Sequence, residues 1–439
     1  MNYILVVLDS LRQDFIGAYG NDWVQTPNLD AFARESAVFH GLRSEALPTI
    51  PVRRALCTGR RVFPFEDCPW PKGIYNRHAG WLPLREGDVT VAEHLQERGY
   101  VTGFVADTYH MFKPAMNFHR GFHAFEWIRG QEYDQWKSGP LKGVDLSRYA
   151  KAGTDPRRLR VLTQYLKNQA DRRGEEDYQA PRVFRAAMDW LEQNAEHERF
   201  FLWVDSFDPH EPWDPPRSYV DLYDPGYGGV EYIYPSGTQP SEMTEAELQH
   251  IRALYAAEVT MVDHWVGRFL RKIDGLGLRE NTLVVVLSDH GKLLGERGAL
   301  GMAAKDTSRE LFNVPLMIRH PKREGAGRRL SGWVYNIDVT VTALNLIGVE
   351  PLPDAEGLDI WPMVRGTTDS VRDHAVCAYN IYGSVWEEDG LYIRNLEDTT
   401  EQLYDLAADP GQTMDMVRDA PERRKIMAEH LDAVLAGKA

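Results

Sequence analysis

The chain opens with Met1-Asn2-Tyr3-Ile4-Leu5-Val6-Val7-Leu8-Asp9, a short apolar run that stops at an aspartate. The run is continuously hydrophobic and rich in β-branched residues, which is the pattern of a strand buried on both faces of a parallel sheet. Residues 101–105, 200–204 and 283–287 repeat this pattern. A polar cluster follows each run, so we expect the strands of one sheet to end in side chains that can bind a ligand.

Helical stretches with clear start and stop signals lie between these strands. Thr90 precedes an apolar helical pattern that stops at Gly99, and Thr244 and Glu247 have the spacing of a capping box before a longer pattern that ends at Gly275. Strands that alternate with helices predict an α/β fold in which a large, mostly parallel sheet is sandwiched by helices. Ligands bind such sheets at the carboxyl ends of the strands.

The chain is predicted to form a catalytic α/β domain over residues 1–350 and a small C-terminal α+β domain over residues 351–439. Within the first, residues 130–178 and 214–243 are rich in Pro, Gly, Tyr and charge and show little periodicity. They are therefore expected to be long surface insertions that shape a substrate pocket. The second contains short strand candidates, beginning with residues 375–379, and is expected to complete the substrate cleft.

Composition and charge exclude several classes of protein. With 43% hydrophobic residues the 439-residue chain has ample material for a globular core. Its formal charge of −15 argues against binding to nucleic acid or to an anionic membrane surface. The first residues lack a basic segment and a cleavage site, and the three cysteines are scattered, so the prediction is a cytoplasmic protein. Nothing in the sequence decides between a monomer and a homo-oligomer.

Asp9, Asp289 and His290 form the first candidate site. They are distant in sequence, but each follows a predicted buried strand, so the fold can bring them together. Two carboxylates and an imidazole suit a divalent cation such as Ca, Mg, Mn or Zn. Each aspartate taken alone is explained equally well as a helix cap.

The stretch Pro48-Thr49-Ile50-Pro51-Val52-Arg53 is the second candidate site. Thr49 is suited to the N-cap and Pro51 to the first turn of a helix whose amide groups would face an anion. Arg53, one turn further on, can reach back to the same place and offers a planar fork to a tetrahedral oxyanion. On spacing alone, a plain capped helix explains these residues as well.

Six motifs are spread in order along almost the whole chain. They are Val7-Leu8-Asp9-Ser10-Leu11-Arg12, Thr26-Pro27-Asn28-Leu29-Asp30, Thr49-x-Pro51-x-Arg53 with Thr58-Gly59-Arg60, Ser288-Asp289-His290-Gly291 with Leu294-Gly295, Val314-Pro315-Leu316, and Leu403-Tyr404-Asp405-Leu406 with Asp409-Pro410. Together they closely resemble the sulfatases of the alkaline phosphatase superfamily. The resemblance implies a large α/β sandwich with a small C-terminal sheet domain, one divalent metal ion, and hydrolysis of sulfate or phosphate esters.

The resemblance also implies roles for the matching residues. Asp9, Asp289 and His290 would hold one divalent metal ion, for which Ca, Mn, Zn and Mg are the candidates. Thr49 would be the nucleophile and a further metal contact, and Arg53 would orient it.

Three further residues complete the implied site. His210, in Asp208-Pro209-His210-Glu211-Pro212, matches the histidine that contacts the substrate oxyanion or leaving group, although by chemistry alone a lone histidine is more often structural. Lys305 is the candidate for a second cationic contact, with a surface lysine as the alternative. His110 resembles the histidine of the family's Lys-Trp-His motif, but Thr108 stands in place of its lysine, so one cationic contact is missing or replaced.

Thr49 is the largest departure from the family pattern. Typical sulfatases carry Cys or Ser there, oxidised to formylglycine, and threonine is not a known precursor of that aldehyde. A metal-activated threonine alkoxide forming a phospho-threonine intermediate fits better, as in the related phosphodiesterases and phosphoglycerol transferases. The resulting prediction is a metal-dependent hydrolase of phosphate mono- or diesters that takes a small anionic ester. A sulfatase with broad ester specificity and a non-catalytic anion-binding homologue remain alternatives.

Overall fold

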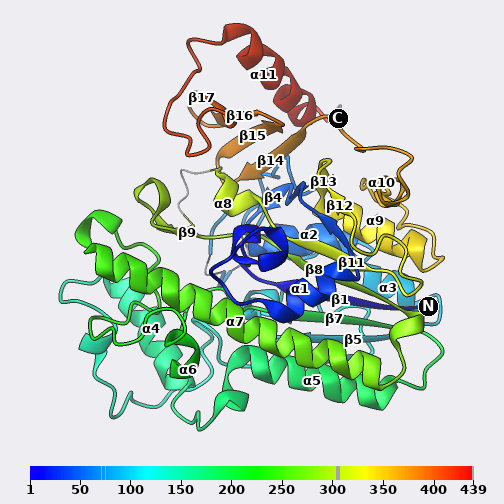
Figure 1. Ribbon diagram of the computed structural model, residues 1–439. Helices are drawn as coiled ribbons and strands as arrows, with labels where there is room; N and C mark the ends of the chain where they lie inside the picture. The colour runs from blue at the N-terminus through cyan, green and yellow to red at the C-terminus, as the bar shows by residue number, and fades with distance from the viewer. Residues whose placement is uncertain (71, 75, 303–306, 438–439) are drawn as a thin grey trace.

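The computed structural model describes residues 1–70, 72–74, 76–302 and 307–437. Within them, an eight-stranded sheet with the order β12-β2-β11-β8-β1-β7-β5-β6 forms the centre of the molecule (Figure 1). Its strands are β1 (Asn2–Leu8), β2 (Ala37–Phe39), β5 (Val101–Ala106), β6 (Ala124–Trp127), β7 (Phe200–Ser206), β8 (Thr282–Ser288), β11 (Leu316–Arg319) and β12 (Arg329–Leu330). Only β11 pairs antiparallel with its neighbours, so the predicted mostly parallel sheet is confirmed.

Strand β1 lies between β7 and β8, and all seven of its residues are buried. Its parallel pairing aligns Leu8 with Ser206 on one side and with Ser288 on the other. The three strands therefore end at the same level. The residues that follow them, Asp9 and Asp289 among them, meet at one edge of the sheet, as expected for the carboxyl ends of parallel strands.

Helices cover both faces of this sheet (Figure 1). Alternate residues of β1 pack on opposite faces, with Ile4, Val6 and Leu8 in one core cluster and Tyr3, Leu5 and Val7 in the other. The capping box predicted at Thr244 is present, and the helix start predicted at Thr90 also carries a capping box. The helices are α1 (Pro27–Arg34), α5 (Gln179–Asn194) and α7 (Glu245–Gly275) on one face, and α2 (Thr49–Thr58), α3 (Val91–Gln96) and α9 (Asn336–Leu346) on the other.

A second sheet, with the order β17-β16-β15-β14-β4, lies beside the first. Four of its strands come from the C-terminal region, namely β14 (Ala375–Tyr379), β15 (Tyr382–Glu387), β16 (Gly390–Asn395) and β17 (Glu401–Asp405), and α11 (Pro421–Leu435) packs on them. The fifth, β4 (Ala46–Leu47), pairs with β14 two residues before Thr49. The C-terminal sheet is thus joined to the segment that carries Thr49, while the predicted boundary at residue 350 stays a prediction.

The insertion over residues 130–178 contains a helix that its sequence pattern did not predict, α4 (Pro156–Asn168). Asp155 caps it by accepting the amides of Arg157 and Arg158, and Pro156 occupies its first turn. The shorter elements are β3 (Leu42–Arg43), β9 (Leu293–Leu294), β10 (Leu300–Gly301), β13 (Val334–Tyr335), α6 (Arg217–Val220), α8 (Arg309–Phe312) and α10 (Trp361–Arg365). Among the described residues, no helix has the length and hydrophobicity needed to cross a membrane.

Candidate active site

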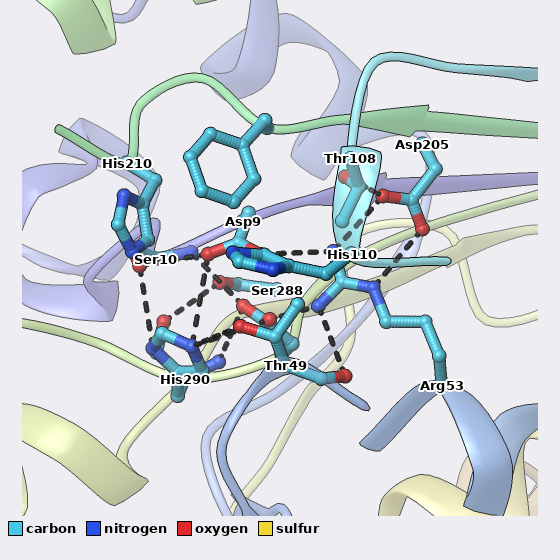
Figure 2. A network of polar contacts seen from close by, with 12 residues as sticks. Asp9, Ser10, Thr49, Arg53, Thr108, His110, Asp205, His210, Ser288 and His290 are labelled. Atoms are coloured by element: carbon cyan, nitrogen blue, oxygen red, sulfur yellow. Dashed lines mark hydrogen bonds and ion pairs between the residues drawn. The ribbon is translucent and has the colours of Figure 1, made fainter. Parts of the chain in front are cut away.

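Thr49 lies at the start of α2, and its side chain points at His290 (Figure 2). It is the first residue of the helix rather than the predicted N-cap, which is Pro48. Its hydroxyl therefore does not cap the helix; Oγ1 lies 3.2 Å from Nε2 of His290. Thr49 is 3% exposed and lines a cavity, so the hydroxyl is buried but reachable from that cavity.

Asp9, Asp289 and His290 come together as predicted. One ligand atom from each lies within 4.8 Å of the others, and all three residues are buried. Asp9 follows β1, and the other two follow β8. The aligned ends of these two adjacent strands thus create the cluster.

The hydrogen bonds of His290 define its tautomer. Nδ1 lies 3.0 Å from the carbonyl oxygen of Gly291 and donates to it. Nε2 consequently turns its lone pair toward Thr49 and the two carboxylates, at 3.7 Å from Oδ1 of Asp9 and 3.4 Å from Oδ2 of Asp289. Burial lowers the pKa of His290 to about 4, so the ring is neutral, as a metal ligand must be.

The two carboxylates differ in their surroundings. Burial and the adjacent charge of Asp289 raise the pKa of Asp9, whereas for Asp289 the charge of Arg53, together with the hydrogen bond from the Ser10 amide, outweighs burial and lowers the pKa. Within the described part of the chain, Oδ2 of Asp9 is buried and makes no hydrogen bond of good geometry, although Nη2 of Arg53 forms an ion pair with it at 3.1 Å. A cation between the carboxylates would satisfy that oxygen and keep both groups ionised. The donor set, two carboxylates and one neutral imidazole, therefore fits a divalent cation.

Arg53 is fully buried and bound by carboxylates. Nε and Nη2 lie 3.1 and 3.0 Å from the two oxygens of Asp205, and Nη2 lies 3.1 Å from Oδ2 of Asp9. Nη1 also pairs with Asp289. The predicted reach toward a tetrahedral oxyanion is not what this geometry offers, because these carboxylates engage the guanidinium on every side that is described (Figure 2).

Lys292 is a site residue that the sequence reasoning missed. It is 2% exposed, and its Nζ lies 2.8 Å from Nε2 of His210 and 2.8 Å from Oε2 of Glu211. Nδ1 of His210 donates to the carbonyl oxygen of Glu211 at 2.6 Å, so Nε2 accepts from Lys292. The signal was its place directly after Ser288-Asp289-His290-Gly291, at the end of a buried strand.

The other predicted residues fall in different places. His110 lines the cavity with Nε2 3.3 Å from Oε2 of Glu132. Thr108 donates to Oδ1 of Asp205 at 2.6 Å, so Asp205 is bound by a hydroxyl and by Arg53. Lys305 lies outside the described residues.

A cavity of about 760 Å³ opens above Thr49. Its floor includes Thr49, His110, His210 and Lys292. Its outer walls come from residues 151–158, 232–239 and 242, which belong to the two predicted insertions. The prediction that these insertions shape the pocket is confirmed, and the volume suits a small-molecule ligand.

A parallel sheet between helices, with acidic and imidazole ligands beside a hydroxyl at the strand ends, defines an ester hydrolase of the alkaline phosphatase type. The Sulfatase family model matches residues 1–349, and the chain belongs to the sulfatase family. It is an ester hydrolase of the sulfatase kind, and enzymes of this family use a divalent metal ion.

Relatives of different specificity resemble the chain over most of its length. An arylsulfatase of Clostridium perfringens is 23% identical over 97% of this chain and 92% of its own. The multifunctional alkaline phosphatase superfamily protein PehA of Trinickia caryophylli is 26% identical over 83% of this chain and 77% of its own. The phosphonate monoester hydrolase of Agrobacterium radiobacter shares the fold, with a TM-score of 0.78 at 20% identity over 100% of this chain and 96% of its own.

Proposed function

We propose that this enzyme is a metal-dependent hydrolase of phosphate mono- or diesters, with Thr49 as its nucleophile. The observation that carries the proposal is the position of the Thr49 hydroxyl, at the cavity floor and 3.2 Å from Nε2 of His290. The substrate is a small anionic ester, which the local cations can bind despite the acidic chain as a whole.

The threonine favours phosphoryl over sulfuryl transfer. A formylglycine hydrate can expel sulfate by re-forming its carbonyl, but a threonine ester has no such exit. Water must cleave the intermediate instead, and a phospho-threonine suits that route better than a sulfo-threonine. The relatives include an arylsulfatase and a phosphonate monoester hydrolase, which supports a site of this kind that takes either ester.

In the attack, Oγ1 of Thr49 gives its proton to water in the cavity and forms a bond to phosphorus, while the bond from phosphorus to the leaving alcohol breaks. A divalent cation held by Asp9, Asp289 and His290 would lower the pKa of the Thr49 hydroxyl and polarise the ester oxygen. Arg53 acts as a positioning residue, since it ties Asp9 and Asp289 to Asp205. Water then attacks the phospho-threonine and regenerates the free hydroxyl.

The leaving alcohol needs a proton, and the non-bridging oxygens of the phosphoryl group need positive charge beside them. In the tautomer described above, Nε2 of His210 accepts a hydrogen bond, so the donor that faces the cavity is Lys292. We assign Lys292 to protonate the leaving oxygen and to stabilise the non-bridging oxygens. His210 aligns its ammonium group, and His110 lies on another part of the floor.

A side-by-side assay tests the proposal. The enzyme, loaded in turn with Ca, Mg, Mn and Zn, is given an aryl phosphodiester, an aryl phosphate and an aryl sulfate with the same leaving phenol. We expect the phosphorus esters to be hydrolysed faster, and Thr49→Ala to abolish their turnover while the protein stays folded. Faster sulfate release would favour the sulfatase alternative, and metal-dependent binding without any turnover would favour the anion-binding homologue.

A further inference from the structure

The outer wall of the active-site cavity is rich in cations. Lys151, Arg157 and Arg158 all line it, within eight residues of one another. Lys151 forms an ion pair with Glu247 at 2.7 Å. The carboxylate of Asp155 accepts hydrogen bonds from the amides at the start of α4. These residues line the same cavity as Thr49, so a substrate held at Thr49 shares that cavity with them.

Arg158 is the buried member of this group, at 9% exposure. Nε donates to the carbonyl oxygen of Tyr234 at 2.6 Å, and Nη1 donates to the hydroxyl of Thr238. The guanidinium carbon lies 5.6 Å from the centre of the Tyr232 ring. These contacts fix the guanidinium plane and leave Nη2 without a hydrogen-bond partner in the described part of the chain.

The charge of Arg158 is not neutralised by its surroundings. Among the described residues, no carboxylate lies within ion-pair distance of it, in contrast to Arg53 with its three carboxylates. Burial lowers the pKa of Arg158, which reflects the cost of an uncompensated charge. A buried cation beside a ligand cavity gains most from an anion supplied by the ligand.

The segment that receives Arg158 also reaches the cavity floor. Tyr234 donates its hydroxyl to Oε1 of Glu132 at 2.8 Å, and Glu132 contacts His110. Ser236 donates to Glu211, the partner of Lys292. Residues 232–238 therefore run from Arg158 to the groups around the reacting centre, so a ligand could span the distance between them.

We infer that Arg158 binds a second anionic group, carried by the alcohol portion of the substrate. The preferred substrates are thus esters of an acidic alcohol, one that bears a carboxylate, sulfate or phosphate in addition to the ester that is cleaved. This inference rests on the proposed function for the identity of the cleaved bond. The exposed Arg157 provides a second positive charge at the same wall.

A matched pair of probes tests the inference. Methyl 4-carboxyphenyl phosphate and methyl 4-carbamoylphenyl phosphate have nearly the same shape but differ by one negative charge. We expect the Thr49→Ala protein to bind the carboxylate roughly 10- to 100-fold more tightly than the amide, measured by calorimetry. The 4-sulfo and 4-phosphono analogues then show which anion binds most tightly.

Substitutions test whether Arg158 causes the preference for the carboxylate probe over the amide probe. In an Arg158→Gln background the ratio of the two affinities is expected to fall to about one, while Arg158→Lys retains part of it. Arg160→Gln, an exposed arginine of the same helix that does not line the cavity, is the control and should keep the full ratio. The ratio is the readout, so a loss of folding that weakens both probes equally does not mimic the effect.

A ratio near one in the protein with Arg158 intact, an unchanged ratio in Arg158→Gln, or an equal loss in Arg160→Gln would overturn the inference. Turnover of both probes by the wild-type enzyme with no preference would refute the second anion site alone. A clear binding preference with no turnover of either probe would refute the proposed function and leave the anion site standing.

Discussion

Nζ of Lys292 lies 2.8 Å from Nε2 of His210, in a site with little access to solvent. Burial lowers the pKa of His210, and Nδ1 is engaged with the carbonyl oxygen of Glu211, so the lone pair on Nε2 faces the ammonium group. The hydrogen bond to His210 thus orients Lys292 as a proton donor at the cavity floor. Glu211, whose Oε2 lies 2.8 Å from Nζ, balances the positive charge of Lys292.

Replacing Lys292 should separate catalysis from stability. Lys292→Met removes the donor at the leaving group, and we expect kcat/KM for an aryl phosphodiester to fall about 10²- to 10⁴-fold. It also leaves the buried Glu211 without its cationic partner, at a cost of about 3–5 kcal/mol in the free energy of unfolding. The double variant Lys292→Met/Glu211→Gln should recover most of that stability in urea titrations without recovering activity; recovery of both would argue against a catalytic role.

Removal of the cation should affect both activity and folding. Chelation should abolish turnover and lower Tm, because a ligand at 100 times its Kd contributes about 2.7 kcal/mol to stability. Asp9→Asn should lose the metal-dependent part of Tm, whereas Asp14→Asn, at an exposed carboxylate nearby, should keep it. A Tm that is unaffected by chelation in the wild-type protein would contradict the assignment of Asp9, Asp289 and His290 as ligands.

His78, on the cavity wall, predicts a pH dependence of stability. Burial, with the charges of His110 and Arg157, lowers its pKa to about 4. Below about pH 6.5 the unfolded chain binds a proton that the folded chain does not bind until about pH 4. Stability should therefore fall with falling pH in this window, by at most about 3 kcal/mol.

Denaturant titrations from pH 4 to 8 check this expectation. Relative to His78→Gln, the wild-type protein should lose stability as the pH falls from 6.5 to 4. The exposed His197 supplies a matched control in His197→Gln. Parallel pH profiles for the wild-type and His78→Gln proteins would refute the burial effect.

Patterns that are local in the sequence predicted much of the fold. The continuous apolar runs gave β1, β5, β7 and β8, because a strand buried on both faces has no polar positions. The threonine at each capping box marked the start of a helix, because its hydroxyl bonds an amide that the helix leaves unpaired. Helix α4 was missed, although Asp155-Pro156 carries a start signal and Val161, Leu162 and Tyr165 are buried at helical spacing.

Contacts between distant residues were harder to predict. Asp9, Asp289 and His290 were found because each follows a recognisable strand, and parallel strands end together. The engagement of Arg53 by three carboxylates and the pairing of β4 with β14 depend on side-chain directions and on long-range pairing that no local pattern encodes. Lys292 was overlooked because its partners His210 and Glu211 come from another strand end.

In the proposed mechanism, Thr49 carries the phosphoryl group between the two steps. Reaction of the enzyme with an aryl phosphodiester, acid quenching within a single turnover, and mass spectrometry of the peptide that contains Thr49 test it most directly. We expect a phosphoryl adduct on Thr49 that appears with the first equivalent of phenol and decays as free product forms, and we expect none in Thr49→Ala. An unmodified Thr49 throughout a full turnover of the wild-type enzyme would contradict it.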